Sequence, residues 1–205
     1  MTYADETPVM HPPLLNAPSS APGSRELRRL LDLGTLPVVC AVLTGLVALY
    51  IFLVALGNIT DPDTNEAFVR HVLSMDTTFQ DEDLMWRAVT NKTAQDVAYV
   101  GIIVWESLTA VVLFWATAAW ARALRTGLFD RPRRLSTVGF LMLEILFVGG
   151  FITIGGEWFA MWQSKTWNGL DPAFRNATIG AFALVLIYLQ SQEPSGAPAQ
   201  GERMQ

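Results

Sequence analysis

Four long apolar runs, separated by polar segments, dominate the pattern of hydrophobic and polar positions along this chain. They occupy residues 36–57, 97–121, 135–154 and 173–189. A transmembrane helix needs about 17–25 predominantly apolar residues to cross the roughly 30 Å hydrocarbon core of a bilayer. The pattern therefore predicts an all-α protein, an integral membrane bundle of four transmembrane helices that form one domain over residues 36–190.

The polar segments between the runs differ in size and charge. Residues 58–96 form a long acidic loop, residues 122–134 a short basic loop and residues 155–172 a tryptophan-rich segment. Within the acidic loop, apolar residues at helical spacing over 64–74 predict a short amphipathic helix. A second apolar patch at 84–86 predicts another short helix beside it.

Two residue pairs have the spacing of a capping box, in which two residues three positions apart satisfy each other's backbone N–H groups. Asp63 with Glu66 lies at the start of the amphipathic helix, and Thr93 with Asp96 lies just before the second apolar run. We expect these two pairs to cap their helices.

The segment 155–172, which we call the outer cap, contains Trp158, Trp162 and Trp167. Tryptophan favours the membrane–water boundary because its ring is apolar and its indole N–H needs a partner. Trp158 and Trp162 are four residues apart, so they share one face if the segment is helical. We expect all three rings to pack on the amphipathic helix over 64–74, so that the two outer segments form one layer.

Glu157, in the outer cap, and Arg175, in the fourth apolar run, both lie near the predicted outer boundary of the membrane. Opposite charges at this depth predict an ion pair between the cap and the helix. Its role would be structural.

Asp61, Asp63 and Asn65 have the spacing of the first ligands in a calcium-binding loop. Such a loop needs glycine at its sixth position and glutamate at its twelfth, where this chain has Glu66 and Val72. The mismatch favours capping and turn formation over calcium binding. A cation site of lower affinity stays open, and the metal is unknown.

Histidine and cysteine are too rare to build a cofactor site. None of the four apolar runs contains a histidine, which argues against a membrane haem held by two axial histidines. His71 lies in the predicted outer helix, where a lone histidine is more often a surface or packing residue. Cys40 is the only cysteine, so an intrachain disulfide is excluded. We expect no cofactor.

Glu106 and Glu144 lie deep inside two of the apolar runs. A charged side chain at mid-bilayer costs about 2.5–3.5 kcal/mol on insertion scales, so such residues usually have a role. Both carboxyls reach nearly the same depth, and no basic residue lies near that depth. If they lie close together, they cannot both ionise and at least one is protonated. This intramembrane carboxyl pair could be a proton or cation site. Alternatively, neutral hydrogen bonds to each other or to Ser107, Thr109 or Tyr50 could hold the helices together.

Composition and charge give the orientation. The chain is 51% hydrophobic and only 16% charged, whereas soluble domains carry about a quarter charged residues. Arginines cluster in two places, 25–29 and 122–134, while 58–96 is acidic and the outer cap has a single lysine. Cytoplasmic loops are enriched in Lys and Arg. We therefore expect both termini to be cytoplasmic and both 58–96 and the outer cap to face outward.

The two ends of the chain are expected to be tails. Residues 1–35 are proline-rich and then basic, which predicts a disordered cytoplasmic tail and a basic flank. The first apolar run begins at Leu36 and is longer than the core of a signal peptide, so none is expected. Residues 191–205 are predicted to form a polar cytoplasmic tail.

Three strings in the outer segments carry a resemblance to a known family. They are NITDPDTNEAFVRHVLSMDTT from Asn58, the tripeptide Trp86-Arg87-Ala88, and GGEWFAMWQSKTWNG from Gly155. Over residues 36–190 the chain resembles a bacterial family of predicted small integral membrane proteins of unknown function. The resemblance implies a four-span protein of the bacterial cytoplasmic membrane, and it implies no activity.

Two functions fit this sequence. The first is a non-catalytic accessory or scaffold protein whose outer cap packs against a partner protein or lipid. The second is a small proton- or cation-linked carrier, which would use the carboxyl pair and function as a homodimer, because four spans fill their own interior. The chain has no nucleophile–base arrangement, P-loop or dinucleotide fingerprint, and no basic patch with interleaved aromatic residues. We therefore expect neither an enzyme nor a nucleic-acid partner.

Overall fold

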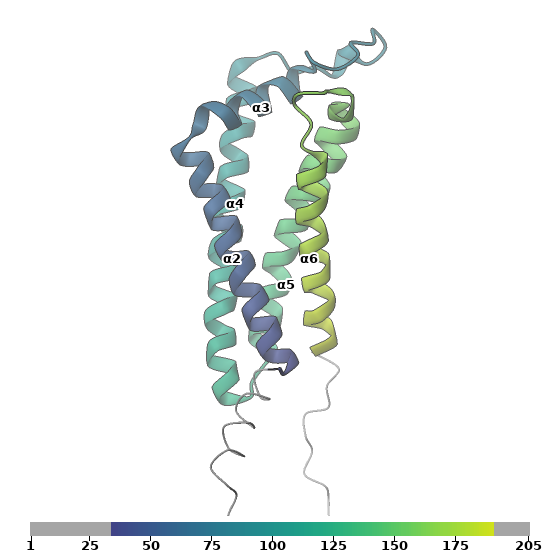
Figure 1. Cartoon of the computed structure of the whole chain (residues 1–205). Helices are drawn as coiled ribbons and strands as arrows, with labels where there is room; N and C mark the ends of the chain where they lie inside the picture. The colour runs from purple at the N-terminus through teal and green to yellow at the C-terminus, as the bar shows by residue number, and fades with distance from the viewer. Residues whose placement is uncertain (1–33, 191–205) are drawn as a thin grey trace, which may run out of the picture. The chain divides into compact units, whose positions relative to one another are not determined.

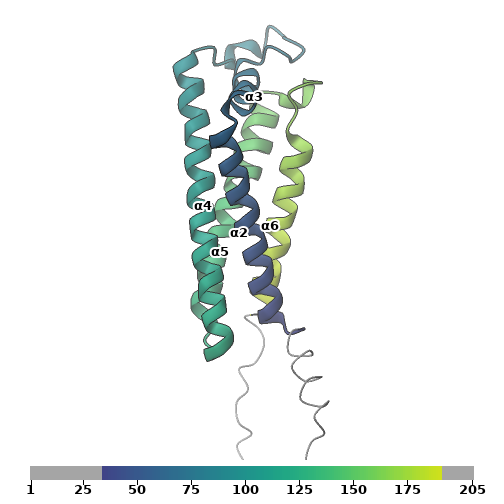
Figure 2. The same cartoon turned by 60° about the vertical axis from the view of Figure 1, so that its left-hand side comes forward.

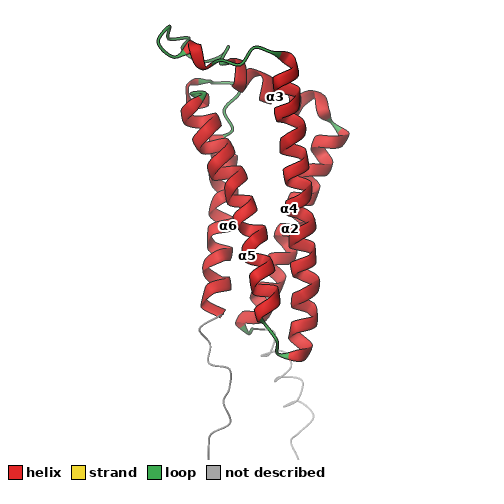
Figure 3. Ribbon diagram, turned by 180° about the vertical axis from the view of Figure 1, so that it is seen from behind, coloured by secondary structure: helices red, strands yellow, loops and turns green. Residues whose placement is uncertain are grey.

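The computed structural model describes residues 34–190, so residues 1–33 of the predicted N-terminal tail and flank and the whole predicted C-terminal tail lie outside the described residues. The elements in chain order are α2 (Leu36–Thr60), α3 (Pro62–Ser74), η1 (Met85–Arg87), α4 (Lys92–Thr126), α5 (Asp130–Glu144), η2 (Ile145–Trp158), η3 (Met161–Gln163) and α6 (Leu170–Gln190) (Figure 1). Helices and loops account for all described residues, with no strand among them (Figure 3). The predicted all-α fold is confirmed.

Four helical segments are long and apolar enough to cross a membrane. They are Leu36–Thr60, Lys92–Thr126, Asp130–Trp158 and Leu170–Gln190, the third being α5 continued by η2. Each contains one predicted apolar run and extends beyond it, because the polar residues at the ends of the runs continue the helix. The predicted bundle of four transmembrane helices is confirmed.

The spans pack around one buried core. α2 packs against α4, α4 against α5, and α6 against α5, η2 and α2 (Figures 1 and 2). Fully buried side chains in this core include Ile51, Leu113, Trp120 and Phe140. The one polar atom of the Trp120 ring is satisfied, since its Nε1 donates to Ser136 Oγ over 2.8 Å.

The third span changes its winding at Glu144. α5 is an ordinary α-helix, whereas η2 is a π-helix with hydrogen bonds five residues apart. The hydroxyl of Thr153 accordingly donates to the carbonyl of Val148, five residues earlier, over 2.8 Å. Because a π-helix has more residues per turn, α-helical spacing does not predict which side chains share a face beyond Ile145.

The predicted outer helix is present, but its cap is different. α3 lies across the end of the bundle that we call the outer end (Figures 1 and 3). Asp61 is its N-cap residue and Pro62 its first residue, so Asp63 lies inside the first turn. No side-chain cap bond forms there. The prediction of a capping box at Asp63 and Glu66 was therefore wrong, because Pro62 fits the first helical position and the helix starts two residues earlier than predicted.

The second predicted capping box was also wrong. α4 begins at Lys92 with Asn91 as its N-cap, and the Asn91 side chain accepts a hydrogen bond from the backbone N–H of Ala94 over 3.0 Å. Thr93 therefore lies within the helix. Asp96 instead accepts from Arg70 of α3 over 2.9 Å, so it joins two helices.

A second buried cluster joins the outer loop to the outer cap. Val72 and Met75, from the end of α3, pack against three consecutive buried residues of the cap, Phe159, Ala160 and Met161. The predicted single outer layer therefore exists. The residues that bury its interface are these three and not the flanking tryptophans, since Trp158 and Trp162 are 45% and 50% exposed.

The outer cap is not one helix. η2 ends at Trp158, Ala160 adopts a left-handed conformation with φ of 51°, and η3 begins at Met161. Trp158 and Trp162 therefore belong to separate elements, and the prediction of a shared helix face was wrong. The reversal at Ala160 turns the chain so that Met161 enters the buried cluster.

Candidate functional site

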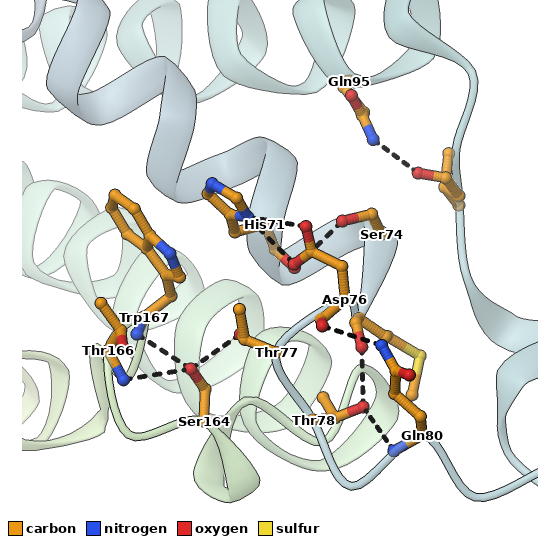
Figure 4. Close-up of polar contacts among 12 residues, drawn as sticks. His71, Ser74, Asp76, Thr77, Thr78, Gln80, Gln95, Ser164, Thr166 and Trp167 are labelled. Carbon is orange, nitrogen blue, oxygen red and sulfur yellow. Dashed lines mark hydrogen bonds and ion pairs between the residues drawn. The ribbon is translucent and has the colours of Figure 1, made fainter.

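Hydrogen bonds fasten the outer loop to the outer cap. Ser164 Oγ lies 2.8 Å from Thr77 Oγ1 and accepts from the backbone N–H of Trp167 over 2.9 Å (Figure 4). The backbone N–H of Phe79 donates to Gln163 Oε1 over 2.9 Å. Both segments are thereby held in one fixed arrangement above the bundle.

Trp167 is the one tryptophan of the cap that packs on α3 as predicted. Its ring stacks on the His71 ring at a centroid distance of 4.6 Å and meets Phe68 edge to face at 6.3 Å. His71 Nδ1 lies 2.8 Å from Asp76 Oδ2 (Figure 4). His71 thus has the packing role that the sequence favoured.

Four other aromatic residues project from the outer layer, and we call them the aromatic face: Phe79, Trp86, Trp158 and Trp162. Trp86 meets Trp158 edge to face at 5.5 Å, and Phe79 meets Trp162 in the same way at 5.9 Å. Phe79 and Trp86 are each 70% exposed. The guanidinium of Arg87 lies over the Trp158 ring, 4.9 Å from its centroid. The rings are therefore ordered by one another while remaining accessible.

The loop between Phe79 and Trp86 is acidic. Asp81, Glu82 and Asp83 lie between Phe79 and Trp86 in the chain, and all three are exposed. Together they make the loop that carries half of the aromatic face strongly acidic.

The base of the same layer has a charged triad. Arg70 donates to Glu66 within α3 and to Asp96 at the start of α4. The hydrogen bond that Arg70 donates to Asp96 is the main cause of the raised pKa of Arg70, and the charge of Glu66 raises this pKa further. Arg70 is therefore always charged, and it fixes α3 to α4 at the protein surface.

The predicted ion pair between Glu157 and Arg175 does not form. Both side chains are exposed, and the ion pairs among residues 34–190 do not include this one. Glu157 lies in the last turn of η2 and Arg175 in the second turn of α6. The two residues lie near the same predicted boundary, but their side chains do not face each other.

Glu106 has a partner that the sequence analysis did not consider. It is 2% exposed, and its Oε2 accepts a hydrogen bond from Asn58 Nδ2 over 2.7 Å. The Tyr99 hydroxyl donates to the backbone carbonyl of Asn58 over 2.6 Å. Residues near the end of α2 and the start of α4 thus converge on one buried carboxyl.

Glu144 lies in a different environment. Its Oε1 is buried and has no hydrogen-bond partner in the part of the chain that the structure describes. The carboxyl lies against Gly180 of α6, where a methyl group built on the glycine would collide with it. Helix α6 can approach this closely only because residue 180 has no side chain.

The two carboxyls therefore do not form a hydrogen-bonded pair. Glu106 is bound by Asn58 of α2 and Glu144 lies against Gly180 of α6. Two of the proposed partners donate to other groups, and the first of them, Thr109, donates to the Trp105 carbonyl. Tyr50 donates to Asn176 Oδ1 over 2.9 Å. The two glutamates lie at similar positions along their spans, but their side chains point toward different helices.

A partly polar cavity of about 260 Å³ opens beside this cluster at the outer end. Its polar lining comes from Asn58, Asn65, Tyr99 and Asn176, and its apolar lining includes Phe147 and Phe151. Asn58 thus contacts both the cavity and the Glu106 carboxylate. Asn58 and Asn176 were overlooked because an asparagine at the end of an apolar run is as common a helix terminus as a binding residue.

Asp61 and Asp63 lie at the junction between α2 and α3. Asp61 ends one helix and precedes the next, and its carboxylate accepts from Thr64 Oγ1 over 3.4 Å. Among residues 34–190, no group of three or more His, Cys, Asp or Glu side chains is placed to hold a metal ion. The junction has the turn-forming geometry that the sequence favoured.

Comparison with known proteins identifies a family. A family model described as predicted small integral membrane protein (DUF2165) matches residues 37–191. No curated protein and no solved structure matches the chain.

Proposed function

From the premise that this chain belongs to the DUF2165 family of predicted small integral membrane proteins, we propose that it is a non-catalytic accessory protein that binds a protein partner through the aromatic face. The observation that carries this proposal is the pairing of exposed rings on a fixed base. Ordered tryptophans beside an arginine are the residues that dominate binding energy in protein interfaces.

The charge around the aromatic face favours a protein over a lipid surface. Asp81, Glu82 and Asp83 would be repelled by anionic headgroups, whereas a partner with basic residues at the rim would be attracted. The partner is therefore a membrane or exported protein with a cationic surface. The rings supply affinity, and the acidic residues supply orientation and a salt-dependent association rate.

Co-purification in mild detergent tests this proposal. The double variant Phe79→Ala/Trp86→Ala removes two exposed rings and leaves the buried outer cluster unchanged. We expect it to weaken binding of the co-purifying protein at least about tenfold, as truncation of central interface aromatics does. Phe182→Ala is the matched control, because Phe182 is a 67% exposed ring on the side of α6.

Charge provides the second readout. The triple variant Asp81→Asn/Glu82→Gln/Asp83→Asn should bind the same protein more weakly at low salt and lose the salt dependence. Equal recovery with the wild type, the ring variant and the charge variant would disprove the proposal. If the ring variant changed only the binding of vesicles, the aromatic face would instead be a lipid contact.

We further propose that the protein lies in the bacterial cytoplasmic membrane with both termini in the cytoplasm. The five arginines over 122–134 and the acidic outer loop support this orientation through the positive-inside rule. A reporter fused after Gln205 should be active in the cytoplasm, and one inserted near Thr78 should be active outside. The reverse result at either position would contradict the orientation.

A second candidate function is a dimeric proton- or cation-linked carrier. The unpartnered Glu144 Oε1 favours it, because an unsatisfied polar group inside a membrane is costly and often functional. Pyranine-loaded proteoliposomes test it, with Glu106→Gln and Glu144→Gln made singly and together. A carrier is supported if the wild type acidifies the vesicle interior in an ion-linked manner and only the variants that contain Glu144→Gln lose this activity. An absence of proton flux in the wild type would exclude a carrier.

A further inference from the structure

The end of the bundle opposite the outer cap carries a groove between α4 and the start of α5. Its volume is about 440 Å³, and its lining includes Trp115, Ala118, Arg122, Leu128 and Arg131. A neighbouring hollow shares Trp115 and Arg131 with it and adds Arg134. The short α4–α5 connection lies at this end of the bundle (Figures 1 and 2).

The polar part of the groove is cationic. Arg122, Arg131 and Arg134 are exposed, and the ion pairs among the described residues include none of them. The lining of the groove contains no acid, and that of the neighbouring hollow contains Asp130, whose carboxylate is already 3.5 Å from the guanidinium of Arg133. Two guanidinium groups, of Arg122 and Arg131, thus line the groove, and a third, of Arg134, lines the adjoining hollow together with Arg131.

The apolar part of the groove continues from the arginines along α4. Trp115 is 55% exposed, and the guanidinium of Arg131 lies 5.9 Å from its ring centroid. Beside it, the small side chains of Ala118 and Ala119 leave the helix surface open. Leu128, which is 74% exposed, adds an apolar side chain at the connection. Along α4, from Arg122 to Trp115, the groove therefore changes from cationic to apolar.

We propose that this groove is a binding site for one anionic phospholipid. The headgroup phosphate lies among Arg122, Arg131 and Arg134, and an acyl chain lies along Trp115 and Ala118. Guanidinium groups bind phosphate oxygens through two parallel hydrogen bonds, and basic pockets between spans at the membrane boundary suit anionic headgroups. A free phosphate would use only the arginines. A phospholipid uses both parts, because its charged headgroup fits the cationic part of the groove and its acyl chain fits the apolar part.

Titration of the purified protein with phosphatidylglycerol, followed by native mass spectrometry, tests the site. Phosphatidylcholine and inorganic phosphate are the comparison ligands. We expect the wild type to retain one phosphatidylglycerol in preference to phosphatidylcholine. Arg122→Gln and Arg131→Gln should each weaken that binding about fivefold, since one cation contributes about that factor near an anionic lipid. Arg175→Gln, an exposed arginine on α6, is the control and should bind as the wild type does.

Ala118→Phe separates the two parts of the groove. This exposed position can accept a ring without entering the core, so the ring should block the acyl chain while all three arginines remain. We expect loss of phosphatidylglycerol binding. Several outcomes would overturn the proposal: equal retention of both lipids by the wild type, unchanged binding in both arginine variants or in Ala118→Phe, or equally tight binding of inorganic phosphate. Melting temperatures measured without added lipid establish that each variant is folded.

Discussion

Glu106 and Glu144 occupy comparable places in their spans but opposite environments. Glu106 is almost fully buried and its carboxylate is bound by Asn58. Glu144 is only partly buried, and its Oε1 has no partner within the described residues. The position of a polar residue along an apolar run therefore does not determine whether its side chain is hydrogen-bonded. That depends on whether the neighbouring helix has a donor at the same place.

The surrounding helices explain the difference. Near Glu106, α2 ends and α4 begins with polar residues. Asn58 reaches the carboxyl, and the Tyr99 hydroxyl donates to the Asn58 backbone carbonyl. Near Glu144, α6 presents Gly180, which has no side chain to donate a hydrogen bond. The Glu106 carboxyl is therefore held by a hydrogen bond, whereas the Glu144 carboxyl occupies the space that Gly180 leaves free.

Asn58→Leu should have the largest effect on stability. It removes the only described hydrogen-bond donor to Glu106 and leaves a buried carboxyl unsatisfied, which costs about 1–3 kcal/mol. We expect a loss near the upper end of that range in the free energy of unfolding, measured by titration with SDS in mixed micelles. Adding Glu106→Leu should restore most of the loss, because both polar groups are then gone. If the double variant is no more stable than Asn58→Leu alone, the loss of stability does not come from the Asn58–Glu106 hydrogen bond.

Gly180→Ala should have a smaller effect that depends on Glu144. The added methyl would collide with the Glu144 carboxylate and lie 2.9 Å from Cδ2 of the buried Leu143. Overpacking of this kind costs about 1–3 kcal/mol, and we expect the lower end because the carboxyl is only partly buried and can move. Combination with Glu144→Ala should relieve part of the loss in melting temperature, whereas combination with Glu106→Ala should not. Equal behaviour of the two combinations would mean that the Gly180 contact does not distinguish the carboxyls.

The smallest effect should come from Glu144→Leu, and its sign should differ from that of Glu106→Leu. Removing an unpartnered polar oxygen from an apolar environment should raise the free energy of unfolding by about 1 kcal/mol. Glu106→Leu should lower it by a similar amount, because it leaves Asn58 Nδ2 without its acceptor. Matched leucine variants in the same SDS titration give the comparison directly. Changes of the same sign would show that the two environments are energetically alike.

The sequence by itself determined the four spans, the outer helix α3 and the presence of two carboxyls inside the membrane. These features depend on the length, composition and period of short stretches, which are local properties of the chain. The arginine clusters, the acidic loop and the tryptophan-rich segment are also visible in the sequence alone. Their separation along the chain was sufficient to predict one outer layer and one basic connection.

Only the tertiary structure decided which side chains meet. The rotation of each helix about its axis, the π-helical winding after Glu144 and the reversal at Ala160 set whether Glu106 contacts Asn58 and whether Met161 is buried. Rotation is chosen by the fit of each helix against all its neighbours together. A glycine such as Gly180 therefore matters through the side chain that it admits from another span, and no local pattern contains that information.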